Sequence, residues 1–275
     1  MINLHETRLN AYRGDYRQFE LTSERRRHEI AREEDRRARR AGVGVGRQRA
    51  AKAVTFEFPT APDFPPEGSP LVRVVDVGFT YPGRDDFRLV NVDLGVYAND
   101  RAAVVGSNCQ GKSTFVRLIA GGLQPTSGTL ERYPKLRIGY YAQHFVDAIG
   151  SIDDTPVQHL VNAYGVKPGE TCRKILGEFG LRGREHLTPI RLLSGGQKAR
   201  VVLAGISTKR PHILLLDEPS NHLDEQSIHA MCDALDAFVG AVIVVSHDAR
   251  LLRRLCADGA VWVGGRGRQS RQVPG

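Results

Sequence analysis

The sequence is poor in the features that mark membrane, secreted and metal-stapled proteins. Its apolar runs, such as residues 213–216 and 241–245, are far shorter than the roughly 18 residues of a membrane-spanning helix, so we expect no membrane insertion. The first eleven residues mix charged with apolar side chains and lack the apolar core of a secretion signal. Only 4 cysteines occur, without the spacing of metal ligands. We therefore expect reduced thiols and a cytoplasmic location.

Charge is abundant and unevenly distributed along the 275 residues. The net charge is +8, and residues 1–50 hold 13 basic against 8 acidic residues. An Arg-rich segment of this kind is typical of a partner rich in phosphate, such as RNA, although a solvated helix or tail has the same composition. The length suits one large domain or two small ones and excludes two full nucleotide-hydrolysing domains.

The chain divides into a charged N-terminal part and an α/β part. Residues 17–41 are mostly helix formers with few apolar side chains, which predicts a charged helix outside the core. Prolines between 59 and 70 predict an extended linker and a domain boundary near residue 70. The rest predicts a mainly parallel sheet with a smaller helical subdomain. We expect strands at 72–77, 102–105, 138–141, 213–216, 241–245 and 260–263, and helices at 170–182 and 195–206.

A glycine-rich loop follows the strand expected at 102–105 and opens an apolar helix, as the phosphate-loop pattern G-x-x-x-x-G-K-S/T requires. Backbone N–H groups of such a loop surround the phosphates of a nucleotide. Lys112 would contact the β- and γ-phosphates, and the Ser113 hydroxyl would bind Mg²⁺. The predicted ATP-binding residues are Gly106, Ser107, Asn108, Cys109, Gln110, Gly111, Lys112, Ser113 and Thr114.

An acidic pair ends the apolar run at 213–216. Asp217 and Glu218 follow a buried strand, whose carboxyl end meets the phosphate loop in open α/β sheets. Asp217 could then hold Mg²⁺, and Glu218 could orient or deprotonate the attacking water. The alternative is an ordinary surface pair of acidic residues after a strand.

A second anion site is expected between these two motifs. Ser194 can cap the helix at 195–206, and Gly195 and Gly196 expose its first N–H groups. Together with Leu193 and Gln197, these residues resemble the Leu-Ser-Gly-Gly-Gln signature of ATP-binding-cassette ATPases. The signature also lies between the phosphate loop and the acidic pair, as in that family. The resemblance covers residues 71–265 and implies a P-loop NTPase fold of the ATP-binding-cassette type.

Further site residues are implied by this resemblance. Tyr81 matches the aromatic residue that stacks on adenine, and Gln143 matches the glutamine that senses Mg²⁺ and the attacking water. His247 matches the histidine that contacts the γ-phosphate, and Asp224 matches the aspartate that communicates between paired cassettes. The alternatives are a packing role for Tyr81, an ordinary polar strand end for Gln143 and a structural role for His247.

One class of cassettes is indicated by residues 221–224, Asn-His-Leu-Asp, and by the extension at 197–201. Both resemble the ABC-F class, in which two cassettes share a chain. Residues 9–19 resemble the stretch that closes a first cassette in eukaryotic members. We therefore expect residues 1–70 to be that tail plus an Arg-rich linker, 71–265 to be the cassette, and 266–275 to be a flexible tail.

The resemblance to ABC-F proteins implies a function. ATP would lie between the phosphate loop of one cassette and Ser194 of another, so we expect hydrolysis of Mg-ATP to need a second copy or another cassette chain. Members of the class act mostly on ribosomes, which the Arg-rich segment would contact through RNA. The alternatives are an ATPase subunit of a membrane transporter, which residues 221–222 argue against, and a non-catalytic ATP-dependent switch.

Overall fold

A computed structural model describes residues 2–5, 8–11, 54–83, 88–105, 111–246, 248–255 and 260–262. The chain forms two compact units, Met1–Lys52 and Ala53–Gly275. In the first unit, β1 (Ile2–His5) and β2 (Arg8–Ala11) pair in antiparallel fashion. The helix expected at 17–41 and the tail expected at 266–275 lie outside the described residues.

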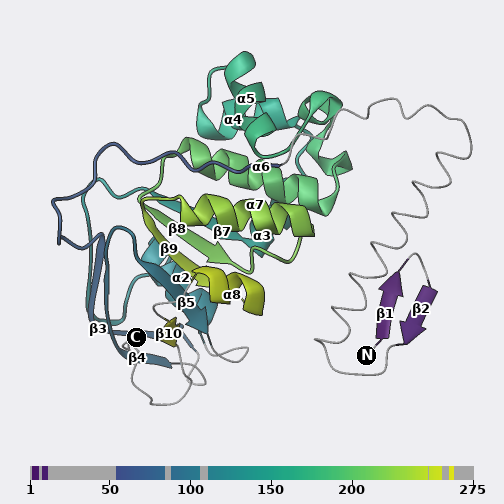
Figure 1. Cartoon of the computed structure of the whole chain (residues 1–275). Helices are drawn as coiled ribbons and strands as arrows, with labels where there is room; N and C mark the ends of the chain where they lie inside the picture. The colour runs from purple at the N-terminus through teal and green to yellow at the C-terminus, as the bar shows by residue number, and fades with distance from the viewer. Residues whose placement is uncertain are drawn as a thin grey trace, which may run out of the picture. The chain divides into compact units, whose positions relative to one another are not determined.

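The second unit is built on a parallel sheet, as predicted. Its strands lie in the order β10-β5-β9-β8-β7, and every neighbouring pair is parallel (Figure 1). Their bounds are Arg101–Val105 (β5), Ile138–Ala142 (β7), Ile213–Asp217 (β8), Ala241–Val245 (β9) and Ala260–Trp262 (β10). Apolar residues fill β8 and β9 continuously because both faces of these central strands are buried.

A separate antiparallel sheet corrects one expectation. The strand expected at 72–77 was assigned to the mainly parallel sheet, but β3 (Val72–Thr80) is the centre of a sheet ordered β4-β3-β6. Its partners, β4 (Arg88–Val96) and β6 (Ser127–Arg132), both pair antiparallel to it. The correction has a physical reason: a strand's apolar pattern shows which face is buried, but not which strand it will pair with.

The helices cover two faces of the parallel sheet. Alternate residues of β8 divide between two cores: Leu214 and Leu216 pack with α6, whereas Ile213 and Leu215 pack with α2. The helices are α2 (Lys112–Ala120), α3 (Gln143–Ile149), α4 (Pro156–Tyr164), α5 (Glu170–Glu178), α6 (Gly195–Thr208), α7 (Glu225–Asp236) and α8 (Ala249–Leu255), with 3-10 turns η1 (Gly183–Leu187) and η2 (Ile190–Leu192). Figure 1 shows α4 and α5 stacked beyond α6, which confirms a helical subdomain.

The two predicted helices of this subdomain differ in accuracy. The helix expected at 195–206 is α6, which continues to Thr208. The helix expected at 170–182 ends at Glu178. It stops because Gly180 takes a left-handed φ of 76°, and the chain then turns into η1.

The linker residues 54–70 contain no helix or strand, and they pack onto the second unit. Phe56 and Phe58 are buried in the core that α6 shares with the parallel sheet. Phe56 stacks on Phe179 with ring centroids 5.0 Å apart, and Phe58 meets Phe179 and Phe238 edge-on at 5.6 and 6.2 Å. The compact unit that contains the sheet begins at Ala53 and therefore includes the proline-rich segment.

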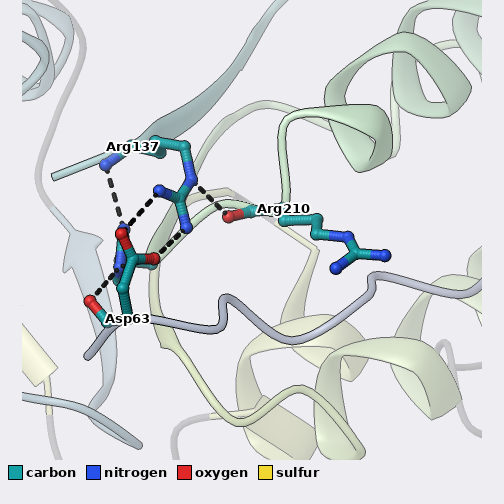
Figure 2. Close-up of polar contacts among 4 residues, drawn as sticks. Asp63, Arg137 and Arg210 are labelled. Carbon is teal, nitrogen blue, oxygen red and sulfur yellow. Dashed lines mark hydrogen bonds and ion pairs between the residues drawn. The ribbon is translucent and has the colours of Figure 1, made fainter. Parts of the chain in front are cut away.

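A polar clamp fastens the same linker to the parallel sheet. Arg137 donates to both carboxylate oxygens of Asp63, at 3.1 and 2.5 Å, and to the Arg210 carbonyl at 3.0 Å (Figure 2). His212 is fully buried and lies between them: its Nδ1 accepts from the Arg137 N–H at 3.0 Å, so Nε2 donates to the Asp63 carbonyl at 3.0 Å. The linker is thus held where β7 and β8 begin.

Candidate nucleotide-binding site

The carboxyl ends of neighbouring strands bring several of the predicted residues to the same edge of the sheet. Register pairs Ala142 with Asp217, and Asp217 with Val245, so β7, β8 and β9 end side by side. β5 lies next to β9 and leads into the phosphate loop. Gln143 follows β7 directly, and His247 lies two residues after β9. Predicted phosphate, magnesium and water contacts therefore converge on one edge of the sheet.

Lys112 begins α2 in a position suited to a phosphate ligand. Gly111 precedes it with a left-handed φ of 94°, which glycine adopts without strain, and it has no side chain to cap the helix. Lys112 is only 9% exposed and Thr114 8%, whereas Ser113 is exposed. A nearly buried ammonium at a helix N-terminus concentrates positive potential where a triphosphate would lie.

Tyr81 reaches the start of α2 from the antiparallel sheet. Its hydroxyl and the Thr114 Oγ1 lie 3.1 Å apart in a hydrogen bond. Its ring packs edge-on against Phe79, with centroids 4.8 Å apart. Tyr81 remains partly exposed, so a packing role and a face for a flat ligand coexist at this residue.

The acidic pair lies at the end of β8 with unusual backbone geometry. Glu218 takes a φ of 50°, in the left-handed region that non-glycine residues rarely adopt, and its N–H donates to the Val245 carbonyl at 2.8 Å. The pKa of the nearby Tyr140 hydroxyl is raised mainly by burial and to a smaller extent by the negative charge of Asp217. Strained backbone at a carboxylate often accompanies a functional role.

The donor chemistry fits a magnesium ion. Ser113 offers a hydroxyl, Asp217 a carboxylate and Gln143 an amide oxygen, and hard oxygen ligands of this kind are what Mg²⁺ prefers beside phosphates. The structure places Asp217 at the strand end and Ser113 in the first turn of α2. It describes Gln143 only as the first residue of α3.

Several predicted residues lie outside the described part. They are the loop residues Gly106, Ser107, Asn108, Cys109 and Gln110, together with His247. The residues on either side of His247 are joined by a hydrogen bond in which the Ser246 hydroxyl accepts from the Asp248 N–H at 3.0 Å.

The signature residues form the start of α6. Ser194 is the N-cap: its Oγ accepts from the Gln197 N–H at 3.3 Å, while the Gln197 side chain accepts from the Ser194 N–H at 2.9 Å. Ser194 and Gly195 are exposed. A side chain at Gly196 would come within 2.9 Å of the His222 carbonyl, so only glycine fits there.

The helices that follow the phosphate loop and the signature, α2 and α6, lie on opposite faces of the sheet. The side chains of α6 pack into one core with Leu214, and those of α2 pack into the other with Leu215. The exposed Ser194 can be reached by a second molecule.

Two carboxylates, one already singled out in the sequence and one not, make contacts that sequence reasoning did not predict. Asp224, expected to communicate between cassettes, caps α7, and its Oδ1 accepts from the Ser227 N–H at 2.8 Å. Glu185, which was not singled out, accepts a hydrogen bond of 2.6 Å from the Gln197 side chain. A lone glutamate in a 3-10 turn carries no sequence signal of such a contact.

Comparison with known proteins agrees with this geometry. The family described as "ABC transporter" matches residues 89–221. Among curated relatives, "ABC transporter F family member 4" of Arabidopsis thaliana is 42% identical over 96% of this chain and 43% of its own length. "Protein GCN20" of Saccharomyces cerevisiae is 35% identical over 98% of this chain and 39% of its own length. The chain belongs to the ABC-F class of ATP-binding-cassette proteins.

The same class recurs among animal relatives. "ATP-binding cassette sub-family F member 2" of Mus musculus is 38% identical over 77% of the ABC-F chain described here and 33% of its own length. The chain thus spans 33–43% of the length of these three relatives.

Solved structures support the fold. A dimeric post-hydrolysis state of an ATP-binding cassette bound to ADP and Pi has a TM-score of 0.60 and 24% identity, covering 74% of this chain and 99% of that one. At that identity, the likeness establishes the ATP-binding-cassette fold alone. Within the described ranges, the structure contains no helix both long and apolar enough to cross a membrane.

Proposed function

We propose that this ABC-F chain binds and hydrolyses Mg-ATP at sites that a second cassette completes. The supporting observation is the placement of Lys112 and Ser194 on helices that cover opposite faces of one sheet. The strand-end residues can hold the nucleotide, and the exposed Ser194 can close over the nucleotide of a partner.

Each residue then has a chemical role. Lys112 and the backbone of 106–114 hold the phosphates, and Tyr81 stacks on adenine. Ser113, Asp217 and Gln143 hold Mg²⁺, which supplies positive charge at the phosphate oxygens.

The reaction needs a base and charge stabilisation at the γ-phosphate. Glu218 orients the attacking water and takes its proton, and the strained backbone holds this carboxylate at the sheet edge. Lys112 and His247 from the same cassette, with Ser194 from the partner, stabilise charge that develops on the γ-phosphate during transfer.

The decisive experiment uses Glu218→Gln. Without the base, turnover should fall about 100-fold or more, and ATP should stay bound between two cassettes. We would measure molar mass by light scattering with and without Mg-ATP, with Glu178→Gln on α5 as the control. A dimer that forms only with Mg-ATP supports the proposal. Unchanged mass would refute cassette pairing, and unchanged turnover would indicate a non-catalytic switch.

We further propose that the chain is the C-terminal half of a two-cassette protein that acts on ribosomes in the cytoplasm. In this arrangement, residues 1–70 are the tail of a preceding cassette plus the linker, and 266–275 form a tail. The excess of basic residues in 1–50 supports a phosphate-rich partner.

Ribosome binding has a direct test. Co-sedimentation with ribosomes should weaken steeply with added salt and disappear when residues 1–50 are removed. Co-purification with a multi-helix membrane protein instead would indicate a transporter ATPase subunit.

A further inference from the structure

The start of α6 is held by a hydrogen-bond chain that begins outside the signature. Glu185 lies in η1, nine residues before Ser194 in the sequence. One of its carboxylate oxygens accepts from the Arg182 N–H at 2.7 Å, and the other accepts from the Gln197 side-chain nitrogen at 2.6 Å. The Gln197 side-chain oxygen accepts in turn from the Ser194 N–H at 2.9 Å.

This series of hydrogen bonds selects one of two orientations of the Gln197 amide. An amide side chain can turn end over end, because its oxygen and nitrogen have nearly the same size. The carboxylate of Glu185 accepts hydrogen bonds only, so it tolerates the Gln197 nitrogen and repels the Gln197 oxygen. Glu185 therefore keeps that oxygen directed at the Ser194 N–H.

The position of Glu185 is itself fixed by the short segment around it. The neighbouring His186 is 8% exposed, and its Nε2 forms a hydrogen bond of 2.8 Å with the Leu181 carbonyl. The Thr188 hydroxyl donates to the Arg184 carbonyl at 2.8 Å. A rigid 3-10 turn thus delivers the carboxylate to Gln197.

We propose that Glu185 is a positioning residue for the signature serine. Through Gln197, it fixes the N-cap geometry of Ser194 and hence the direction of the hydroxyl offered to a partner cassette. The consequence for catalysis rests on the proposed function, whereas the effect on the start of α6 holds without nucleotide.

The test is an exchange of the two side chains. Gln197→Glu places two carboxylates against each other, and Glu185→Gln leaves one donor facing another donor. The double variant, Glu185→Gln with Gln197→Glu, restores all three hydrogen bonds: the new amide at 185 accepts from Arg182 and donates to 197, and the new carboxylate at 197 accepts from Ser194. The net charge of the double variant equals that of the starting protein.

The first measurement needs no nucleotide. Hydrogen exchange of the amides at 194–199 should be about tenfold faster in Gln197→Glu, about threefold faster in Glu185→Gln, and restored in the double variant. Exchange at the start of α7, capped by Asp224, serves as the internal reference. Glu178→Gln, which loses a pair with Lys174 at 3.8 Å on α5, is the matched control and should leave exchange unchanged.

The second measurement places all variants in the Glu218→Gln background and follows the dimer with Mg-ATP. The dimer dissociation constant should rise about tenfold for Gln197→Glu and return within about twofold of the parent in the double variant. ATP affinity of the dilute monomer should stay constant, because Lys112 and its loop are untouched. A merely structural role would change the melting temperature without this selective rescue.

The two proposals fail in different ways. A Glu218→Gln parent that does not dimerise refutes the proposed function, and hydrogen exchange still decides the role of Glu185. The positioning role is wrong if the single variants exchange like the parent, or if the double variant exchanges and dimerises like Gln197→Glu.

Discussion

The parallel sheet differs between the edge where its strands begin, here called the amino edge, and the edge where they end, here called the carboxyl edge. At the amino edge, side chains form hydrogen bonds to backbone groups of distant segments. Arg137 and His212 hold the linker at Asp63. Arg101 donates to the carbonyls of Gly240, Leu235 and Phe238. At the carboxyl edge, Ser113 is exposed and Glu218 has a left-handed backbone with a φ of 50°.

The amino edge of the sheet contributes mainly to stability, whereas the carboxyl edge holds the predicted site. His212 is buried at the amino edge with both ring nitrogens hydrogen-bonded, which contributes to the free energy of unfolding. Removing its ring would leave the Arg137 N–H and the Asp63 carbonyl without these bonds, at a cost in stability. The carboxyl edge instead stores strain, as the left-handed Glu218 shows, and keeps Ser113 exposed for a ligand. We therefore expect substitutions at the two edges to affect different measurements.

The largest effect is expected at the carboxyl edge from Lys112→Met. Methionine keeps the apolar stem but removes the charge from the phosphates, so ATP turnover should fall by about 10²- to 10³-fold. The free energy of unfolding should change by less than about 1 kcal/mol. Phosphate release and urea titration measure the two quantities. Lys174→Met, at an exposed position on α5, should change neither, and a turnover loss below about tenfold would contradict the assigned role.

At the amino edge, His212→Ala should act on stability instead. Two hydrogen bonds and the packing of a fully buried ring disappear, so the free energy of unfolding should fall by about 2–4 kcal/mol. ATP turnover per folded molecule should stay the same. His229→Ala, an exposed histidine on α7, is the control for urea titration. A loss below about 1 kcal/mol would mean that the clamp contributes little.

A smaller effect should separate the two roles of Tyr81. Tyr81→Ala removes the ring face and should raise the dissociation constant of ATP about tenfold. Tyr81→Phe keeps the ring and loses the hydroxyl that bonds to Thr114, so it should change this constant less than about twofold. Calorimetric titration of the monomer measures both. Equal losses in the two variants would assign the binding contribution to the hydroxyl rather than the ring.

The smallest effect concerns pH and the clamp. The hydrogen bond from Arg137, opposed by partial burial and aided by the charge of Arg137, holds the pKa of Asp63 below its ordinary value of 3.8. A lowered pKa in the folded state contributes stability that is present above 3.8 and is lost as pH falls through the folded value.

Asp63→Asn tests this pH dependence. The melting temperature of the unsubstituted protein should exceed that of the variant near about pH 5, and the difference should shrink toward about pH 2. Asp153→Asn, at an exposed ion pair with Arg191, should show a weaker trend. A difference that stays constant with pH would exclude titration of Asp63 as its cause.

Local pattern explains which parts could be predicted. The strands ending at Val105 and Asp217 were found because continuous apolar runs lead directly into a glycine-rich loop and an acidic pair. The helix α6 was found because a capping serine and glycines precede an apolar stretch. These signals each span only a few residues.

Contacts between distant residues explain what was missed. Asp63 meets Arg137 across 74 positions and His212 across 149, and no local pattern links them. The pairing of β3 with β4 and β6 was missed for the same reason. Glu185 and Gln197 are only 12 positions apart, but a 3-10 turn brings them together, and its geometry has no clear sequence signature.

The amino-acid sequence by itself determined the chemistry available and the order in which it is offered, because each motif combines particular side chains with the strand or helix end that precedes or begins it. Only the tertiary structure decided that the linker is held through Asp63 where β7 and β8 begin, and that α2 and α6 pack on opposite faces of the sheet. Those outcomes depend on which distant segments bury each other's apolar surface, a choice that local propensity does not contain.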